Sequence, residues 1–333
     1  MLLWTFDGGD ARVALPRARF GKTEMEITKV GFGSWAIGGG GWGGAWGAQD
    51  DREALDAILR AVEVGINWID TAAVYGTGHS EELVAEALGS VPEADRPYVF
   101  TKCSLKWDEN RDIVNVLKKD SVKRECEDSL RRLRAEVIDL YQIHWPRPEE
   151  DIEEGWEALA ELKEEGKVRH IGVSNFSVEQ LERIRHIAPV ETLQPPYNML
   201  NRGVEDGILP YCQKNDIGVI VYSPMRSGLL TGKMTRERVE NMPDDDWRRN
   251  SDDFNEPKLS RNLKLVEILE EVGAEHDASP GEVAIAWTLR RPEVTAAIVG
   301  GRRPDQVDGI IGAADLALSD EELRRIEEAI PAG

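Results

Sequence analysis

The chain has 333 residues, of which 41% are hydrophobic and 31% charged, a composition typical of a folded globular protein rather than a disordered one. Its 41 basic and 62 acidic residues give a net charge of −21, and such an acidic surface repels nucleic acid and anionic membranes. No apolar run approaches the roughly 20 residues of a spanning helix, and the charges soon after 1–6 exclude a signal-peptide core, so we expect a cytoplasmic protein.

A short apolar strand followed by an amphipathic helix recurs along the chain. We expect strands at 30–33, 68–70, 98–101, 137–143, 168–173, 192–194, 218–222 and 297–299. The helices that follow them are expected at about 51–64, 80–88, 118–133, 153–165, 177–187, 207–215, 261–276 and 304–312. Two further helices, at 282–290 and 321–330, are extra to the repeat. A hairpin formed by residues before Arg19 and by 25–27 is expected to close the barrel floor.

Local signals mark several helix starts. Ser177 with Gln180, Ser279 with Glu282 and Ser319 with Glu322 have the spacing of capping boxes. Pro280 and Pro304 suit the first turn of a helix, where a missing N–H costs nothing.

Strand–helix alternation predicts parallel strands with right-handed crossovers, and eight units over this length favour an α/β fold of the (β/α)8 barrel type. An open doubly wound sheet would need a GxGxxG turn leading directly into the first helix, which the glycines of 38–44 do not provide. We interpret 38–44 as a mobile loop over the barrel mouth; a tolerant Gly-rich linker is the alternative. We expect one domain, 1–333 with a core of about 17–330, in which 236–257 is a polar insertion.

Polar residues gather at the predicted carboxyl ends of the strands, where such barrels carry their chemistry. These residues are Asp70, Lys102, His144, Ser174, Asn175, Gln194, Tyr222, Ser223 and 300–303, with Tyr75 in the loop after Asp70. Asp70 and Lys102 end neighbouring strands and could pair in the barrel mouth. A lysine cation near Tyr75 would stabilise the phenolate and lower its pKa, making Tyr75 a usable proton donor near neutral pH.

Each of these residues also has a structural interpretation. Asp70 and Lys102 could form only a buried structural ion pair, and His144 could only cap its strand. Their shared location favours the functional interpretation, in which His144 orients a carbonyl or completes a proton relay.

Several segments together resemble the aldo-keto reductase family, in its bacterial branch that is similar to potassium-channel β subunits. The matching segments are Asp70-Thr71-Ala72 with Tyr75-Gly76 and Ser80-Glu81, Thr101-Lys102, 139–145 (DLYQIHW), 166–169, 172–176 (GVSNF), Gln194 with Tyr197-Asn198, 222–224 and 228–233 (GLLTGK). The likeness covers nearly all of 17–330.

The resemblance implies a role for each matching position. Tyr75 would be the proton donor, tuned by Lys102 and Asp70, with His144 orienting the substrate. The remaining positions would hold a nicotinamide cofactor: Ser174, Asn175 and Gln194 at the carboxamide, Tyr222 stacked on the ring with Ser223 beside it, the backbone at Gly228 and Leu229 on the pyrophosphate, and Lys233. The reaction would be reduction of an aldehyde or ketone, reversible toward the alcohol.

Cofactor choice depends on 300–306 (GGRRPDQ), with Gly300, Arg302, Arg303 and Gln306 as cofactor contacts. Two arginines beside a helix start suit a ribose 2′-phosphate, which favours NADP(H) over NADH. Ordinary surface charges are the alternative. The family usually follows with Glu-Asn at the adenine, whereas Gly309 and Ile310 stand here, so NADH remains an alternative cofactor.

Tryptophans lie near the predicted mouth, at Trp35, Trp42, Trp46, Trp107 and Trp145. Aromatic walls suit apolar or aromatic carbonyl compounds, although we expect at least two of the five to pack in the core. The three cysteines, Cys103, Cys126 and Cys212, lie far apart and the five histidines form no ligand pair, so we predict neither a disulfide nor a metal site.

Two other functions are compatible with parts of this pattern. The first is a slow, redox-sensing subunit that binds the cofactor and reports its state to a partner. The second is an unrelated barrel enzyme that depends on a metal, which the scattered histidines oppose. The acidic surplus is either a well-solvated surface or an adaptation to a high-salt cytoplasm. The sequence predicts a small carbonyl compound as the partner and does not indicate an oligomeric state.

Overall fold

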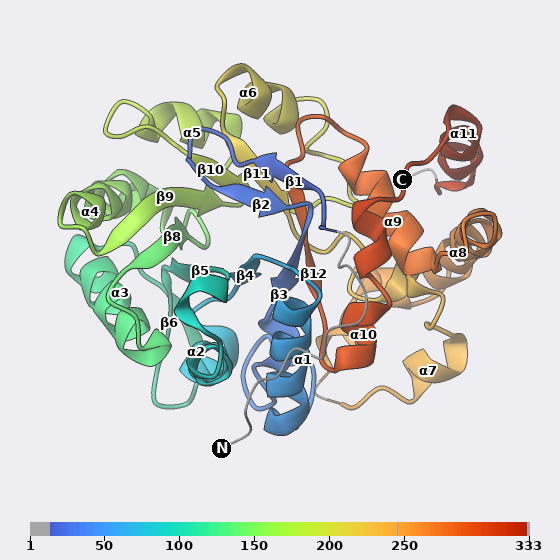
Figure 1. Cartoon of the computed structure of the whole chain (residues 1–333), viewed down its shortest axis with the longest axis horizontal. Helices are drawn as coiled ribbons and strands as arrows, with labels where there is room; N and C mark the ends of the chain where they lie inside the picture. Colours follow the sequence, from blue (N-terminus) through green and yellow to red (C-terminus); the bar gives the residue numbers. More distant parts are fainter. Residues whose placement is uncertain (1–13, 245, 332–333) are drawn as a thin grey trace.

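A computed structural model describes residues 14–244 and 246–331, so the sequence prediction for 1–6 lies outside the described part of the chain. Within it, eight parallel strands close into a barrel, in the order β10-β11-β12-β3-β4-β5-β8-β9. Figure 1 shows the helices arranged around this ring of strands. The strands are β3 (Val30–Gly33), β4 (Trp68–Asp70), β5 (Tyr98–Cys103), β8 (Ile138–Ile143), β9 (Val168–Ser174), β10 (Thr192–Gln194), β11 (Gly218–Val221) and β12 (Ala296–Gly300).

Most α-helices of the described residues fall close to their predicted ranges, but α7 was not predicted and α10 ends four residues before its predicted end. They are α1 (Asp51–Glu63), α2 (His79–Gly89), α3 (Lys119–Leu133), α4 (Ile152–Glu164), α5 (Val178–Ile184), α6 (Ile208–Lys214), α7 (Arg236–Glu240), α8 (Lys258–Ala274), α9 (Pro280–Leu289), α10 (Pro304–Asp308) and α11 (Asp320–Ala329). No helix of the described residues is long and apolar enough to cross a membrane.

The expected starts of three helices are confirmed. The hydroxyls of Ser177, Ser279 and Ser319 each accept from the backbone N–H three residues on. In return, the side-chain oxygens of Gln180, Glu282 and Glu322 accept from the backbone N–H of these serines. Pro280 and Pro304 occupy the first turns of α9 and α10. These caps satisfy N–H groups that have no partner within the helix.

The barrel floor is closed by the predicted N-terminal hairpin, in which β1 (Arg17–Arg19) pairs antiparallel with β2 (Glu26–Thr28). In Figure 1 this hairpin lies across the ring of strands. Phe20, in its turn, is fully buried and stacks on Phe100 with ring centroids 5.9 Å apart, and Phe100 stacks on Trp68 at 5.4 Å. Gly218 has no side chain because a Cβ there would lie 2.4 Å from the Phe20 ring. The aromatic stack fills the barrel interior below the site.

A second hairpin follows β5 and was not predicted. It consists of β6 (Leu105–Trp107) paired antiparallel with β7 (Ile113–Asn115). Its short strands show no clear alternation of apolar and polar residues. The segment that joins them, Asp-Glu-Asn-Arg-Asp at 108–112, has the composition of a loop. The 236–257 insertion also has structure, namely α7 and the 3-10 helices η6 (Trp247–Asn250) and η7 (Asp252–Phe254).

Candidate active site

One elongated cavity of about 720 Å³ opens at the carboxyl ends of the barrel strands. The structure brings fourteen of the sixteen predicted site residues to its wall: Asp70, Tyr75, His144, Ser174, Asn175, Gln194, Tyr222, Ser223, Gly228, Lys233, Gly300, Arg302, Arg303 and Gln306. Two predicted residues, Lys102 and Leu229, do not line it. Parallel strands end on one side of the barrel, which explains why residues at the ends of β4, β8, β9, β10, β11 and β12 meet there.

An ion pair lies beneath this wall at one end of the cavity. Lys102 Nζ is 2.5 Å from Asp70 Oδ1 and also donates to the backbone oxygen of Thr71 at 2.8 Å. Gln194 Nε2 donates to the second oxygen, Asp70 Oδ2, at 2.8 Å. Lys102 and Asp70 are buried, so each needs the other to offset the loss of water.

Tyr75 lies directly above that pair. The Lys102 ammonium is 5.3 Å from the centre of the Tyr75 ring, and the His144 ring packs edge-on against Tyr75 with centroids 5.7 Å apart. The turn that carries Tyr75 is the 3-10 helix η2 (Tyr75–Gly78), in which Gly76 has a φ of 62°. The four predicted catalytic residues therefore form one cluster.

The expected lowering of the Tyr75 pKa is wrong for this structure. Burial raises the pKa of Tyr75 well above its ordinary value, and the charge of Asp70 raises it further. The Lys102 cation does not reverse this because Asp70 neutralises it at close range. Burial also lowers the pKa of Lys102, and burial together with Lys102 lowers the pKa of His144 well below its usual value. Tyr75 is therefore a protonated phenol and His144 a neutral imidazole.

Hydrogen bonds fix the polar residues beside this cluster. Asn175 Nδ2 donates to the His144 backbone oxygen at 2.9 Å, and Tyr222 donates from its hydroxyl to Asn175 Oδ1 at 2.8 Å. Ser174 Oγ donates to the backbone oxygen of Gln194 at 2.7 Å. Asn175 holds its place with a φ of 65°, a conformation that Asn tolerates better than most residues. These bonds pre-set the ends of β8, β9 and β10 around the cavity.

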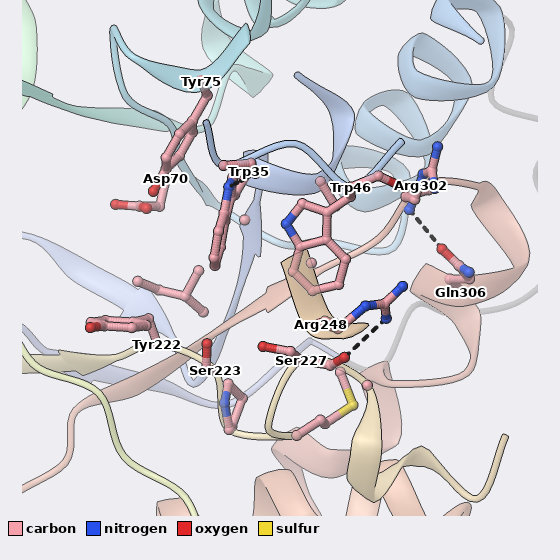
Figure 2. A pocket seen from close by; sticks show the side chains of 18 of the residues that line it. Trp35, Trp46, Asp70, Tyr75, Tyr222, Ser223, Ser227, Arg248, Arg302 and Gln306 are labelled. Atoms are coloured by element: carbon pink, nitrogen blue, oxygen red, sulfur yellow. Dashed lines mark hydrogen bonds between the residues drawn. The ribbon is translucent and has the colours of Figure 1, made fainter. Parts of the chain in front are cut away.

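The far end of the cavity is cationic. Figure 2 shows Arg302 and Gln306 there, with Trp46 and Arg248 between them and the Asp70–Tyr75–Tyr222 end. Arg302 donates to Gln49 Oε1 at 2.5 Å and to the backbone oxygens of Trp46 and Ala48, so its described partners are uncharged oxygens. Gln306 Oε1 accepts from the Arg302 N–H at 2.7 Å. Arg303, which lies nearer the solvent, pairs with Asp305 at 3.1 Å.

Burial and the nearby Arg248 and Arg303 cations lower the pKa of Arg302, which remains charged at any neutral pH. The half-buried Arg302 guanidinium thus lies beside two other guanidinium groups, although the net charge of the protein is −21. A bound anion would reduce the repulsion between these three cations.

The side chain of Leu229 does not line the cavity, and its predicted backbone contact with a pyrophosphate stays a prediction. Its side chain is fully buried in a cluster with Met234 and Phe254, and its N–H donates to the Arg226 oxygen at 3.1 Å. Gly228, with a φ of 87°, remains at the cavity wall.

The glycine-rich segment lies over the mouth, as expected. Trp35, Trp42, Trp46 and Trp145 line the cavity, whereas Trp107 does not and packs under Arg132 instead. Trp35 stacks on Tyr75 with ring centroids 6.2 Å apart. The cysteines are buried and unpaired, and no cluster of three or more metal-binding side chains occurs within 14–244 and 246–331.

Arg248 and Trp247 were not predicted. Arg248 lies 4.6 Å over the Trp46 ring, donates to the Ser227 oxygen at 3.2 Å and pairs with buried Asp246 at 2.6 Å. Trp247 stacks on Trp35 at 6.0 Å. Both belong to the polar insertion, whose sequence carries no periodic signal that would have placed it over the site.

The fold and this cluster define a barrel oxidoreductase, and comparison with known proteins supports the assignment. A profile of the Aldo/keto reductase family matches residues 29–331, and the chain belongs to this family. It is therefore an oxidoreductase of carbonyl compounds that uses a nicotinamide cofactor.

Individual relatives cover nearly the whole chain. It is 38% identical over 305 residues to aldo-keto reductase YhdN of Bacillus subtilis, covering 91% of this chain and 90% of the relative. It is 33% identical to the NADH-specific methylglyoxal reductase of Escherichia coli, with 93% and 98% covered. Among solved structures, glycerol dehydrogenase AKR11B4 from Gluconobacter oxydans superposes with a TM-score of 0.85 at 39% identity, with 94% of both chains covered.

Proposed function

We propose that this protein is an NADP(H)-dependent carbonyl reductase in which Tyr75 is the proton donor. The observation that carries the proposal is the placement of Tyr75 and His144 above the buried Asp70–Lys102 pair at one end of a cavity whose other end holds Arg302 and Arg303. The cavity of about 720 Å³ is lined by both groups of residues, and its size suits a dinucleotide that lies along it.

The donor and acceptor set fits the parts of such a cofactor. Ser174, Asn175 and Gln194 would hold the carboxamide, and Tyr222 would stack on the ring. Ser223, Gly228 and Lys233 would take the pyrophosphate; Gly300, Arg302, Arg303 and Gln306 would take the adenosine end. When bound, the reduced nicotinamide supplies a hydride to the carbonyl carbon.

The protein's own part is to position the carbonyl and to deliver a proton. Neutral His144 donates a hydrogen bond to the carbonyl oxygen, which orients it toward Tyr75 without bringing a second charge into the pocket. Tyr75 gives its proton to that oxygen as negative charge develops on it. The phenolate that remains has the Lys102 cation 5.3 Å from its ring, partly offset by Asp70, and it recovers its proton from solvent. In the reverse direction the same residues accept the proton of an alcohol.

The preference for the 2′-phosphate rests on the Arg302 and Arg303 cations. The Escherichia coli relative is named NADH-specific, so NADH is the competing cofactor. Gly309 and Ile310 line the cavity where the family usually has Glu-Asn, which weakens the adenine contacts. The cytoplasmic location, the single-domain organisation and a small carbonyl substrate without nucleic-acid or membrane partners remain predictions from the sequence.

Titration of the protein with NADPH and, separately, NADH tests the proposal. Trp35 and Trp46 lie at the cavity and report binding by fluorescence quenching. We expect saturable binding that is much tighter for NADPH, followed by turnover of aldehydes. Equal affinity would retain the reductase and remove the NADP(H) preference; binding of neither cofactor would refute the function.

A further inference from the structure

Glu125 is a buried carboxylate that the proposed chemistry does not use. It lies on α3, is 7% exposed and forms no ion pair among the described residues. Its Oε2 accepts the backbone N–H of Ser104 at 2.9 Å, and its Oε1 accepts the Ser121 hydroxyl at 3.0 Å. A buried charge bonded to only two neutral donors is costly, so its place calls for an explanation.

Ser104 is the residue that joins Glu125 to the site. It follows β5 two residues after Lys102 and has a φ of 81°, a left-handed conformation that is uncommon for serine. Its backbone oxygen accepts from Val116 at 3.0 Å, which closes the base of the β6–β7 hairpin. Its hydroxyl lies 3.3 Å from both the backbone nitrogen and the backbone oxygen of Trp145. Ser104 therefore joins β5, the hairpin and the segment after His144.

These joined segments form one wall of the cavity near Tyr75. Leu105 and Ile113 of the hairpin line it, and so does Trp145. The neighbouring His144 N–H donates to the Cys103 oxygen at 3.1 Å, a bond that involves neither Ser104 nor Glu125. The wall lies at the end of the cavity where a carbonyl would approach Tyr75, away from Arg302 and Gln306.

We propose that Glu125 is a positioning residue that, through Ser104, fixes the substrate-side wall formed by Leu105, Ile113 and Trp145. The inference rests on the proposed carbonyl reductase function and adds to it a control of substrate affinity that leaves cofactor affinity unchanged. As a carboxylate, Glu125 holds Ser104 by a charge-assisted hydrogen bond; as a neutral acid, it holds Ser104 more weakly.

The environment of Glu125 makes this control sensitive to pH. Burial raises the pKa of Glu125 to about 7, against the opposing bonds from Ser121 and Ser104 and the charges of Lys106 on β6 and Arg132 on α3. Cys103 on β5 and Tyr141 on β8 also lie near it, and the pKa of each is raised, so both stay neutral near pH 7. Glu125 is thus the group of this cluster that changes charge near neutrality.

Steady-state reduction of 4-nitrobenzaldehyde by NADPH tests the proposal in the full chain. In the wild type, we expect the aldehyde KM to rise as the pH falls through about 7. Glu125→Gln resembles the neutral acid, so it should show the raised KM, about 5-fold, on both sides of that pH. Its kcat and its Kd for NADPH should stay at wild-type values. Glu127→Gln, an exposed position on the same helix, is the control and should keep the wild-type profile.

A wild-type KM profile in Glu125→Gln would overturn the proposal, and so would an equal loss of NADPH affinity. A double-mutant cycle with Ser104→Ala checks the route through Ser104. Glu125 holds the Ser104 backbone N–H, and the Ser104 hydroxyl in turn contacts Trp145. If Glu125 acts on the wall along this route, the two effects on KM should be far from additive, whereas additive effects would refute the route.

Hydrogen exchange of the Ser104 amide tests the role of Glu125 independently of whether the protein is a carbonyl reductase. At one pH above 7, the amide should exchange faster in Glu125→Gln than in the wild type, whether or not the protein reduces the aldehyde. Absence of turnover with this difference would refute the function alone. Equal exchange rates would refute the role of Glu125 alone.

Discussion

Lys102 Nζ lies 2.5 Å from Asp70 Oδ1, with both side chains almost fully buried near the Tyr75 ring. Lys102→Met would leave Asp70 buried without a counter-charge, which we expect to destabilise the fold by about 3–5 kcal/mol. The double variant with Asp70→Asn should recover much of that loss, because it removes the orphaned charge. Denaturant unfolding of both proteins measures the difference. Equal stability of the single and double variants would show that the ion pair is not coupled as its geometry indicates.

Tyr75→Phe keeps the ring between Trp35 and His144 but removes the phenolic proton. We expect turnover to fall by roughly 10²- to 10⁴-fold with little change in cofactor affinity. Tyr211→Phe, on the outer helix α6, is the matched control and should keep its activity. Substantial turnover by Tyr75→Phe would mean that another group delivers the proton.

Arg302→Ala and Arg303→Ala test the cofactor preference. Each charge-assisted contact to a phosphate contributes roughly 1.5–3 kcal/mol, so NADPH affinity should fall by about 10- to 100-fold, with much less effect on NADH. Arg302 also donates hydrogen bonds to residues of 46–49. Its replacement should therefore lower the affinity for both cofactors somewhat more than replacement of Arg303. Fluorescence titration gives both affinities. Equal losses for NADPH and NADH would contradict the 2′-phosphate assignment.

Gly76 occupies a position where no side chain fits. Its φ is 62°, and a Cβ would lie 2.1 Å from the Gly38 oxygen, so Gly76→Ala must push apart the turns that carry Tyr75 and Trp35. We expect a loss of about 1–3 kcal/mol in the free energy of unfolding. Gly89→Ala, at the end of α2 with open space around its Cβ, should instead be neutral or stabilise by about 0.4–1 kcal/mol. A wild-type melting curve for Gly76→Ala would show that these turns yield easily.

His170 links the stability of the floor to pH. Burial opposes its protonation, but pairing with Glu191 at 3.0 Å and with Glu24 at 3.1 Å outweighs burial and raises the pKa of His170 above its ordinary value. A raised pKa stabilises the folded state most below the unfolded value of about 6.5, and this contribution is lost as the pH rises through the folded pKa. The free energy of unfolding should therefore decline over that window. His170→Gln should flatten the decline, and an unchanged slope would assign it to other groups.

The periodic part of the chain was predictable because its signal is local. Apolar runs such as 168–173 alternate with helices whose first residues are indicated by capping residues such as Ser177. Both signals depend only on residues that are close together in the chain. Asp70 and Lys102 could be paired in advance because adjacent parallel strands end side by side. Their contact was therefore a consequence of topology.

The remaining features depend on contacts between distant segments. Arg248 reaches Trp46 from an insertion about two hundred residues further along the chain, and no period in 236–257 indicates this contact. Lys102 suggested a lowered Tyr75 pKa, but the sign depends on how deeply the ring is buried and how completely Asp70 cancels the lysine charge. The direction of the Leu229 side chain follows from packing against Met234 and Phe254, which the sequence pattern alone does not show.

The Phe20–Phe100–Trp68 stack separates the two ends of the barrel, which therefore differ in function. The lower end is aromatic and closed by a hairpin, and none of the proposed chemistry reaches it. The upper end carries every residue to which we assign a contact with the reactants. Substitutions that stiffen the lower end, such as a tighter turn around Gly21, can therefore be selected for heat resistance without altering what the enzyme reduces. Conversely, the hairpin and the 236–257 insertion around the mouth can be exchanged to change the substrate while the lower end keeps the barrel folded.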